Sequence, residues 1–439
     1  MVKIILANLI PELDEAQALK ADKNKFKSLN YPLGLGIIAN VLKKADIAFQ
    51  TIDTYVKETT PGFMETVGFE KPDLILMSGF LGNFMYAFLY KLTHKIKEVS
   101  PQSRIIIGGP IGSTIPELLV DRCKVDYAVV GEGEKTIIEL LDTIETGGNV
   151  KSVKGVVFKD DTGKVVFTGD RERIKDLDQE SEFPLYDAFP IQKYIDYLNK
   201  TGRCWEISTS RGCYGSCTFC KLTFGNKITS YSNQSIIRHM CYVNERYNVN
   251  RFSFVDDNFL NHPGKADEFV DLLMQQDVDF KWRFQGRADR ISPEFVKRAS
   301  AAGLFDISFG IESADPEILK QYGKKLDIGK ALDKLMAIKD IININCNFIV
   351  GAPGETWDSI KKSEAFIKQL KLKTVNAGIL MLFPGTALYL EALKKGYIKD
   401  EHEYCINFGH PYDYPYINIC NLSDNELIQA KQFLMDAVK

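Results

Sequence analysis

Three closely spaced cysteines in the middle of the chain are the residues whose type and spacing could do chemistry. Cys213, Cys217 and Cys220 stand at C-x3-C-x2-C spacing, and the residues between them carry no charge. Cysteine thiolates ligate iron–sulfur clusters, and three ligands on a four-iron cube leave one iron open to a small molecule. The spacing therefore predicts a [4Fe–4S] cluster with an open iron.

A zinc site or free thiols are the alternatives to a cluster. Zinc takes four ligands, typically from two spaced pairs. The next candidates after Cys220 are His239 and Cys241, which do not form a second pair. The spacing therefore favours iron–sulfur chemistry over zinc.

The cysteine spacing, with the aromatic Phe219 before the last cysteine, resembles the signature of the radical S-adenosylmethionine (SAM) superfamily. In that family the open iron binds the amino and carboxylate groups of SAM. One electron from the cluster splits SAM into methionine and a 5′-deoxyadenosyl radical, which removes a hydrogen atom from an unreactive carbon. The resemblance implies SAM as cofactor and an electron donor such as flavodoxin or ferredoxin.

The chain around the cysteines must present them to a ligand, and a series of strand-length apolar runs predicts how it does so. The runs are residues 204–210, 251–256, 281–285, 305–311, 343–350 and 374–380, with helix-length stretches between them. Six β/α units predict a partial (β/α)6 TIM-type barrel over residues 199–390. Barrel enzymes carry chemistry at the strand carboxyl ends, where the cysteine loop lies.

Polar residues end the second and third of these strands. A carboxylate of Asp256 or Asp257 could hold the ammonium of SAM or could cap a helix. Gln285 and Arg287 end the third strand, where the arginine could hold a carboxylate or neutralise Asp289.

Ser308 and Glu312 end the fourth strand, and a carboxylate leaving so apolar a strand favours function. Pro-Gly turns follow the fifth and sixth strands at residues 351–356 and 383–386, and the resemblance implies that their backbones line the adenine pocket. The expected SAM contacts are Phe219, Asp256, Asp257, Gln285, Arg287, Ser308, Glu312 and Pro384.

The first third of the chain alternates buried strands with amphipathic helices. Strands are predicted at residues 2–7, 48–53, 73–78, 104–108 and 126–130, and helices at residues 33–44, 84–99, 114–119 and 134–144. Continuous apolar runs suit parallel strands covered on both faces. We predict an α/β fold with a doubly wound, Rossmann-like parallel sheet over residues 1–148.

Glycines cluster where these strands end, at the edge where open α/β sheets bind ligands. Each pair alone is explained by a tight turn, but four in register favour a flat, bulky ligand or a domain contact. With the cysteine signature, the arrangement resembles the cobalamin-binding domain of one branch of the radical SAM superfamily. The cobalamin contacts that this resemblance implies are Tyr31, Leu33, Gly34, Ser78, Gly79, Gly82, Asn83, Gly108, Gly109, Pro110, Gly131 and Glu132.

One feature of mutase-type cobalamin proteins is absent. The Asp-x-His-x-x-Gly motif that supplies an imidazole to cobalt does not occur, and His94 has Leu92 and Lys97 where that motif needs Asp and Gly. We expect His94 on a helix surface and no protein histidine on cobalt.

The remaining segments carry no predicted chemistry. Residues 149–198 read as a connector with a β-hairpin around Asp160-Asp161-Thr162-Gly163. Residues 391–439 read as a helical and aromatic tail, in which residues 410–416 either cover a substrate or pack against the barrel mouth.

Composition bounds the class of protein. The chain has 439 residues, 45% hydrophobic and 26% charged, which suits two or three globular domains. A net charge of -3 gives no basic field for nucleic acid, and no segment reads as a membrane span or signal peptide. Nine cysteines, three of them clustered, favour a reducing cytoplasm over a disulfide framework.

Three functions are open to such a chain. The first is cobalamin-dependent radical methylation of an unactivated carbon, with methylcobalamin as the methyl donor. The second is a radical rearrangement, cyclisation or oxidation without methyl transfer. The third is a cobalamin- or metal-binding protein without catalysis. The substrate could be a small metabolite, a lipid or a peptide.

Overall fold

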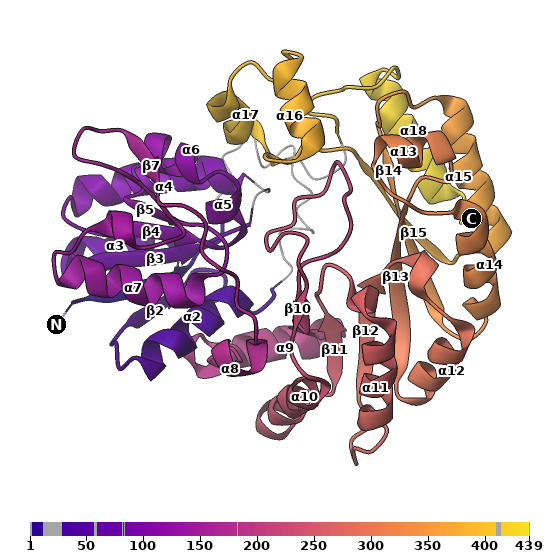
Figure 1. Ribbon diagram of the computed structural model, residues 1–439, viewed down its shortest axis with the longest axis horizontal. Coiled ribbons are helices and arrows are strands. Elements are labelled where there is room, and N and C mark those ends of the chain that lie inside the picture. Colours follow the sequence, from indigo (N-terminus) through magenta and orange to yellow (C-terminus); the bar gives the residue numbers. More distant parts are fainter. Residues whose placement is uncertain are drawn as a thin grey trace. The chain divides into compact units, whose positions relative to one another are not determined.

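The structure, a computed structural model, describes residues 2–11, 29–56, 59–80, 82, 84–181, 183–409 and 414–438. These residues form two compact units (Figure 1). The first unit comprises Met1–Thr201 and Lys399–Pro411, and the second comprises Gly202–Ile398 and Tyr412–Lys439. The predicted boundaries at residues 148, 198 and 390 stay predictions.

The described part of the first unit is built on one sheet with strand order β2-β1-β3-β4-β5-β6-β7. Strands β1 to β5 pair in parallel, and 2-1-3-4-5 is a doubly wound order, so the predicted fold class is confirmed. The strands are β1 (Ile4–Asn8), β2 (Gln50–Asp53), β3 (Leu74–Ser78), β4 (Arg104–Gly108), β5 (Tyr127–Val129), β6 (Val156–Lys159) and β7 (Val165–Phe167).

Helices cover the sheet of the first unit. They are α2 (Leu33–Lys44), α3 (Thr60–Glu70), α4 (Met85–Val99), α5 (Gly109–Thr114), α6 (Pro116–Arg122), α7 (Gly133–Glu145), α8 (Leu177–Glu180), α9 (Ile191–Thr201) and, from the far end of the chain, α17 (Glu401–Asn407). Helix α3 was not predicted, because Gly62 and Gly68 lower its helix propensity. Its start is nevertheless marked by Thr59, whose hydroxyl accepts the Gly62 N–H at 3.1 Å.

The connector does more than link two domains. Strands β6 and β7 form the predicted hairpin, and β6 also pairs antiparallel with β5. The hairpin therefore extends the parallel sheet at its edge.

In the part of the second unit that the structure describes, six parallel strands lie in the order β15-β14-β13-β12-β11-β8. This is the predicted partial barrel. The strands are β8 (Trp205–Ile207), β11 (Arg251–Phe254), β12 (Lys281–Gly286), β13 (Leu304–Glu312), β14 (Asn343–Val350) and β15 (Thr374–Ile379).

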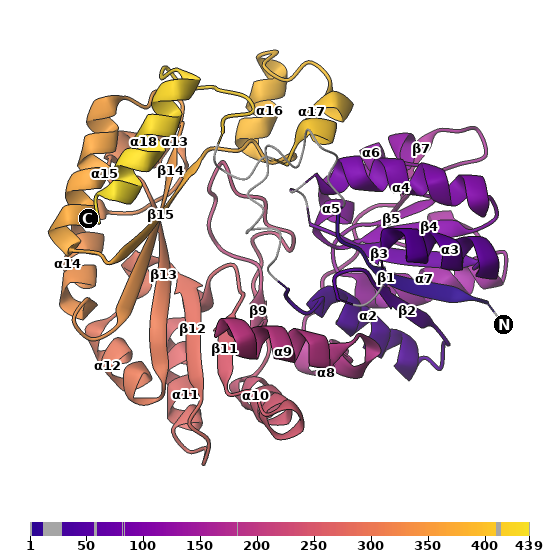
Figure 2. The ribbon, with the colours of Figure 1, turned by 180° about the vertical axis from the view of Figure 1, so that it is seen from behind.

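Helices lie along the outer face of this curved sheet (Figure 2). They include α10 (Asn233–Tyr247), α11 (Pro263–Leu273), α12 (Pro293–Ala301), α14 (Ile328–Ile338) and α15 (Trp357–Leu370), and α13 (Pro316–Gln321), α16 (Ala387–Lys394) and α18 (Asp424–Asp436) complete the unit. Trp282 is fully buried beneath them, with its ring centroid 5.4 Å from Phe254 and 5.3 Å from Phe269. The opposite, inner face of the sheet carries polar side chains.

Among the described helices, none is both long and apolar enough to cross a bilayer.

Candidate functional site

The cysteine loop is closed at its base by a short antiparallel ladder that the sequence did not reveal. Strand β9 (Ser210–Arg211) pairs with β10 (Thr229–Ser230). Gly212 follows with φ +91°, and a Cβ there would lie 2.3 Å from the Lys227 carbonyl oxygen. Only glycine lets the two ends of the loop approach this closely.

The loop rests on the chain segment that follows α13. The Thr218 N–H donates to the Tyr322 carbonyl at 2.9 Å, and its hydroxyl donates to the Gln321 carbonyl at 2.9 Å. The Phe219 ring packs edge-on against Tyr322 at 5.0 Å. Gly323 has φ +60°, and a Cβ there would lie 2.9 Å from the Ser216 carbonyl oxygen. The backbone of residues 321–323 is thus the platform of the cysteine loop.

The three thiols converge on one another. The Gly215 N–H donates to Cys213 Sγ at 3.3 Å, and a Cβ on Gly215 would lie 3.9 Å from Cys217 Sγ. Burial raises the pKa of the Cys220 thiol to about 12, with Cys217 and Asp257 as further causes. Three thiolates here would therefore repel one another unless cations lay between them.

This donor set fits an iron–sulfur cluster. Among the described residues, no three His, Cys, Asp or Glu side chains lie close enough together to hold one metal ion. Each cysteine of a four-iron cluster binds a different iron. Three converging thiols suit such a cluster, and Cys213, Cys217 and Cys220 would be its ligands.

A buried ion pair lies beside the thiols. Lys324 Nζ donates to Glu312 Oε1 at 2.8 Å, and both side chains are at most one-tenth exposed. Glu312 has φ +65° and follows a register shift between β13 and β14. Both charges act on the Cys217 thiol, so they lie beside the expected cluster. The sequence analysis named Glu312 but missed Lys324.

The two aspartates after β11 differ. Asp256 is buried, and its Oδ1 accepts the N–H groups of Thr209 and Ser210, each at 2.7 Å. Burial raises the pKa of Asp256 to about 6, and the bonds from Thr209 and Ser210 oppose that shift. Asp256 therefore braces the start of the cysteine loop. Asp257, in contrast, is exposed and acts on the Cys220 thiol. Gln285, at the end of β12, donates from Nε2 to the Asp256 carbonyl at 2.9 Å.

Arg287 forms an ion pair with Asp289 in its own turn, which is the neutralising role considered for it above. Its Nε donates to Asp289 Oδ1 at 3.0 Å, and its Nη2 donates to the Lys325 carbonyl at 2.5 Å. The guanidinium also lies 5.7 Å from the Tyr214 ring centroid, and Arg290 Nε donates to the Tyr214 hydroxyl at 3.0 Å. Both arginines thus hold the outer part of the cysteine loop.

Rows of amide and hydroxyl side chains line the inner face of the second sheet. Strand neighbours in register point to the same face. Ser308 pairs with Asn345 across β13 and β14, and the Ser308 hydroxyl accepts from Asn347 Nδ2 at 3.1 Å. Asn376 Nδ2 on β15 donates to Asn347 Oδ1 at 3.0 Å, and Asn376 is exposed. The inner face therefore offers amide donors and acceptors to a ligand.

The Pro-Gly turn after β15 meets the cysteine loop. A Cβ on Gly385 would lie 2.9 Å from Lys221 Nζ, next to Cys220 in the chain. The Leu388 N–H donates to the Thr218 carbonyl at 3.1 Å. Pro384 itself is buried in this turn.

The carboxyl edge of the first sheet contains open cradles beside glycine. A Cβ on Gly34 or on Gly131 would meet no atom within 4 Å, and one on Gly82 would meet only Phe80, at 3.9 Å. Gly82 has φ +134° and Gly131 has φ +80°. Space that a side chain would fill, next to backbone at the strand ends, fits a bulky cofactor such as cobalamin.

Two neighbouring glycines at this edge are explained by packing. A Cβ on Gly109 would lie 2.2 Å from Ser78 Oγ, and one on Gly79 would lie 3.1 Å from Met85. Gly108 precedes α5, and Pro110 stands in its first turn. These residues bring the ends of β3 and β4 together.

The other predicted cobalamin contacts differ in exposure. Tyr31 is buried, donates to the Leu185 carbonyl at 2.7 Å and packs 4.9 Å from the Tyr186 ring. Glu132 is buried and accepts the Ile174 N–H at 2.7 Å. Both side chains therefore bond to the backbone of the connector, residues 149–198. Leu33 begins α2, and Asn83 lies outside the described residues.

His94 lies on α4 and donates from Nδ1 to the Tyr90 carbonyl at 2.7 Å, within its own helix. The expectation that it is a helix-surface residue is confirmed by its partial exposure.

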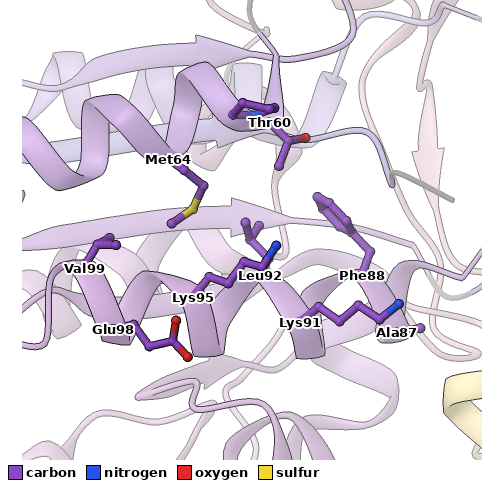
Figure 3. Close-up of a pocket in the computed structure, with 10 residues that line it drawn as sticks. Thr60, Met64, Ala87, Phe88, Lys91, Leu92, Lys95, Glu98 and Val99 are labelled. Carbon is purple, nitrogen blue, oxygen red and sulfur yellow. The ribbon is translucent and has the colours of Figure 1, made fainter. Parts of the chain in front are cut away.

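A surface groove of about 450 Å³ runs between α3 and α4 (Figure 3). Apolar side chains of Met64, Phe88 and Leu92 line it, with Lys91 and Lys95 at its rim. None of the residues predicted for the cluster, SAM or cobalamin lines this groove.

Comparison with protein families finds two matches on this chain. The radical SAM superfamily profile matches residues 207–367, which include the cysteine loop. The B12 binding domain profile matches residues 19–141, which include the glycine-edged sheet.

Curated relatives cover most of the chain. An uncharacterized methyltransferase of Pyrococcus horikoshii is 28% identical over 82% of this chain and 78% of its own length. Cytidylyl-2-hydroxyethylphosphonate methyltransferase of Streptomyces wedmorensis is 23% identical over 91% and 84%. Anaerobic magnesium-protoporphyrin IX monomethyl ester cyclase of Rubrivivax gelatinosus is 25% identical over 77% of this chain and 62% of its own length.

Solved structures share the fold. The radical SAM methyltransferase TsrM of Kitasatospora setae superposes with a TM-score of 0.74 at 17% identity, over 91% of this chain and 77% of that one. The cobalamin-dependent radical SAM enzyme OxsB superposes with a TM-score of 0.70 at 20% identity over 96% of this chain. The present chain spans 58% of the OxsB chain.

The Gly323 platform makes a testable prediction. Gly323→Ala places a Cβ 2.9 Å from the Ser216 carbonyl in a left-handed conformation. Because the Ser216 carbonyl belongs to the cysteine loop, the clash should displace the loop, and a displacement that costs about 1.4 kcal/mol in cluster binding corresponds to roughly a tenfold loss of affinity. Iron and sulfide content after anaerobic reconstitution measures this. Gly396→Ala is the matched control, because Gly396 has φ +74° but open space around it. Equal iron in both variants would contradict the platform.

Proposed function

The chain belongs to the radical SAM superfamily, in the branch with a cobalamin-binding domain, and from this premise we propose that it is a cobalamin-dependent C-methyltransferase acting on an unactivated carbon. The observation that carries the proposal is the presence in one chain of the three-thiol loop and of a doubly wound sheet with open glycine cradles. The methyltransferase names of two relatives support methyl transfer as the outcome.

The bound cofactors would supply a 5′-deoxyadenosyl radical from SAM and a methyl group from cobalamin, and the chain's own residues do the rest. Cys213, Cys217 and Cys220 ligate the cluster. Lys324 and Glu312 offer a buried cation and anion beside it, matching the carboxylate and ammonium of SAM. Asp257, Phe219 and Pro384 border the same loop and are proposed to complete the SAM pocket.

The inner face of the second sheet supports a polar substrate. The amide side chains on this face belong to Asn345, Asn347 and Asn376. Amides form hydrogen bonds with polar ligands, which a hydrocarbon ligand cannot do. We therefore favour a small polar metabolite over a lipid. An electron donor such as flavodoxin or ferredoxin would reduce the cluster, and the oxygen sensitivity of such a cluster favours the reducing cytoplasm as its place of work.

The proposal includes a cobalamin whose cobalt is not ligated by a histidine of the protein. His94 bonds within α4, and the first unit contains one further described histidine, His402, whose Nδ1 is 2.7 Å from the Tyr86 hydroxyl. The cob(II)alamin form should give an electron paramagnetic resonance spectrum whose nitrogen splitting is the same in protein labelled with [15N]histidine and in unlabelled protein. A splitting that changes with the label would place an imidazole on cobalt.

Lys324 is the strongest candidate for binding the SAM carboxylate. Lys324→Met should weaken SAM binding about tenfold or more, because a hydrogen bond to a charged group contributes about 1.5–3 kcal/mol. Equilibrium dialysis gives the SAM affinity, and the change in the reduced cluster's paramagnetic spectrum on adding SAM gives a second readout. Lys320→Met, at an exposed position one turn earlier, is the control. Unchanged affinity in Lys324→Met would remove Lys324 from the pocket.

The reaction is tested with methyl-deuterated SAM. Anaerobic enzyme reconstituted with cluster and cobalamin, with reductant and an extract of cell metabolites, should form S-adenosylhomocysteine and 5′-deoxyadenosine and should transfer the label to one metabolite, as read by mass spectrometry. The Cys217→Ala variant should do none of these.

The other outcomes separate the rival functions. Deoxyadenosine with a product of unchanged carbon count would indicate a rearrangement, cyclisation or oxidation. The cyclase relative makes this the second candidate. No cleavage of SAM under strong reductant would indicate a binding protein without catalysis.

A further inference from the structure

A segment from near the end of the chain is built into the first unit. Residues 399–409, here called the C-terminal strap, follow the second unit's strands but pack with residues 1–201. Their helix α17 contacts α4. Cys405 and Phe408 are at most 1% exposed, so the strap is part of the first unit's core.

One polar contact fixes the strap to the first turn of α4. The Tyr86 hydroxyl and His402 Nδ1 are 2.7 Å apart, and their rings pack edge-on at 5.6 Å. Burial raises the pKa of Tyr86 well above its ordinary value, with the Cys123 thiol as the next cause. Tyr86 therefore keeps its proton, and its hydroxyl can donate a hydrogen bond to His402 Nδ1.

A backbone contact fixes the strap to the residue just before α4. A Cβ on Gly409 would lie 2.3 Å from the Phe84 nitrogen and 2.6 Å from its ring. Phe84 is 4% exposed and has φ +58°, a left-handed conformation that a bulky residue keeps only when its surroundings enforce it. Gly409 is one of those surroundings.

The contacted residues end the loop that joins β3 to α4 at the sheet's carboxyl edge. Ser78 at the end of β3 and Gly79 and Gly82 of this loop are predicted cobalamin contacts, and the Gly82 carbonyl accepts the Met85 N–H at 2.9 Å. A shift of Phe84 or of the α4 start is therefore passed directly to Gly82. The cradle beside Gly82 depends on where the strap holds Phe84.

We propose that the C-terminal strap sets the geometry of the cobalamin site, with Gly409 and His402 as positioning residues that act through Phe84 and Tyr86. The inference rests on the proposed function, because it requires the first unit to bind cobalamin. It adds to that function a segment whose His402 lies 316 residues from its partner Tyr86 in the chain.

The test titrates full-length, cluster-reconstituted protein with hydroxocobalamin and follows the visible spectrum. Gly409→Ala should weaken cobalamin binding at least tenfold, and His402→Ala should weaken it several-fold. His402→Asn, which keeps a hydrogen-bonding atom near the Nδ1 position, should recover most of the affinity. SAM affinity and iron content should stay at wild-type values in all three variants, because the cluster loop belongs to the second unit.

Two controls separate positioning from general damage. Glu403→Ala changes an exposed side chain on α17, and Gly264→Ala adds a methyl group in open space on α11; both should bind cobalamin normally. If Gly409→Ala does not fold, the comparison of His402→Ala with His402→Asn tests the strap's role. Equal cobalamin affinity in His402→Ala and wild type would overturn the strap's role while leaving the proposed function intact. Failure of the wild-type protein to bind cobalamin would overturn both.

Discussion

Backbone contact between the cysteine loop and residues 321–323 is the interaction on which the chemistry of the second unit depends. Thiol positions follow from the loop's backbone, and the carbonyls of Tyr322 and Gln321 hold that backbone by accepting from the Thr218 N–H and the Thr218 hydroxyl. Gly323 makes the close approach possible. The next residue, Lys324, then enters the interior beside the thiols, so one turn of chain both supports the loop and delivers a charge to it.

Stability alone does not explain that buried charge. Buried ion pairs contribute little net stability, because desolvation offsets their attraction. Glu312 also sits in a left-handed conformation, which costs of order 1–3 kcal/mol at a non-glycine residue. The converging thiols and the neighbouring Asp257 add negative charge to the same place. A bound cluster and a zwitterionic ligand would offset these costs, and a purely structural site would gain nothing from them.

Patterns local in sequence were readable before the structure, and contacts distant in sequence were not. Buried runs placed the strands within a few residues, and the cysteine spacing identified the loop, because both depend on neighbours along the chain. Lys324 was missed because Gly-Lys-Lys after a helix reads as an exposed helix end. Arg287 was given two roles that only a structure could separate, since its partner Asp289 is visible in sequence but its bond to the Lys325 carbonyl is not.

The strap packs with the first unit although it follows the second unit's strands in the chain. The sequence predicts one tail over residues 391–439, and within it residues 399–409 group with the first unit and residues 414–438 with the second. His402 and Tyr86 are 316 residues apart, so no periodicity or composition signal joins them. The whole second sheet lies between them in the chain, and a ribosome makes that sheet before the strap. The first unit therefore cannot complete its core until the second sheet has been synthesised, and a fragment ending at Thr201 would lack Cys405 and Phe408 from its interior.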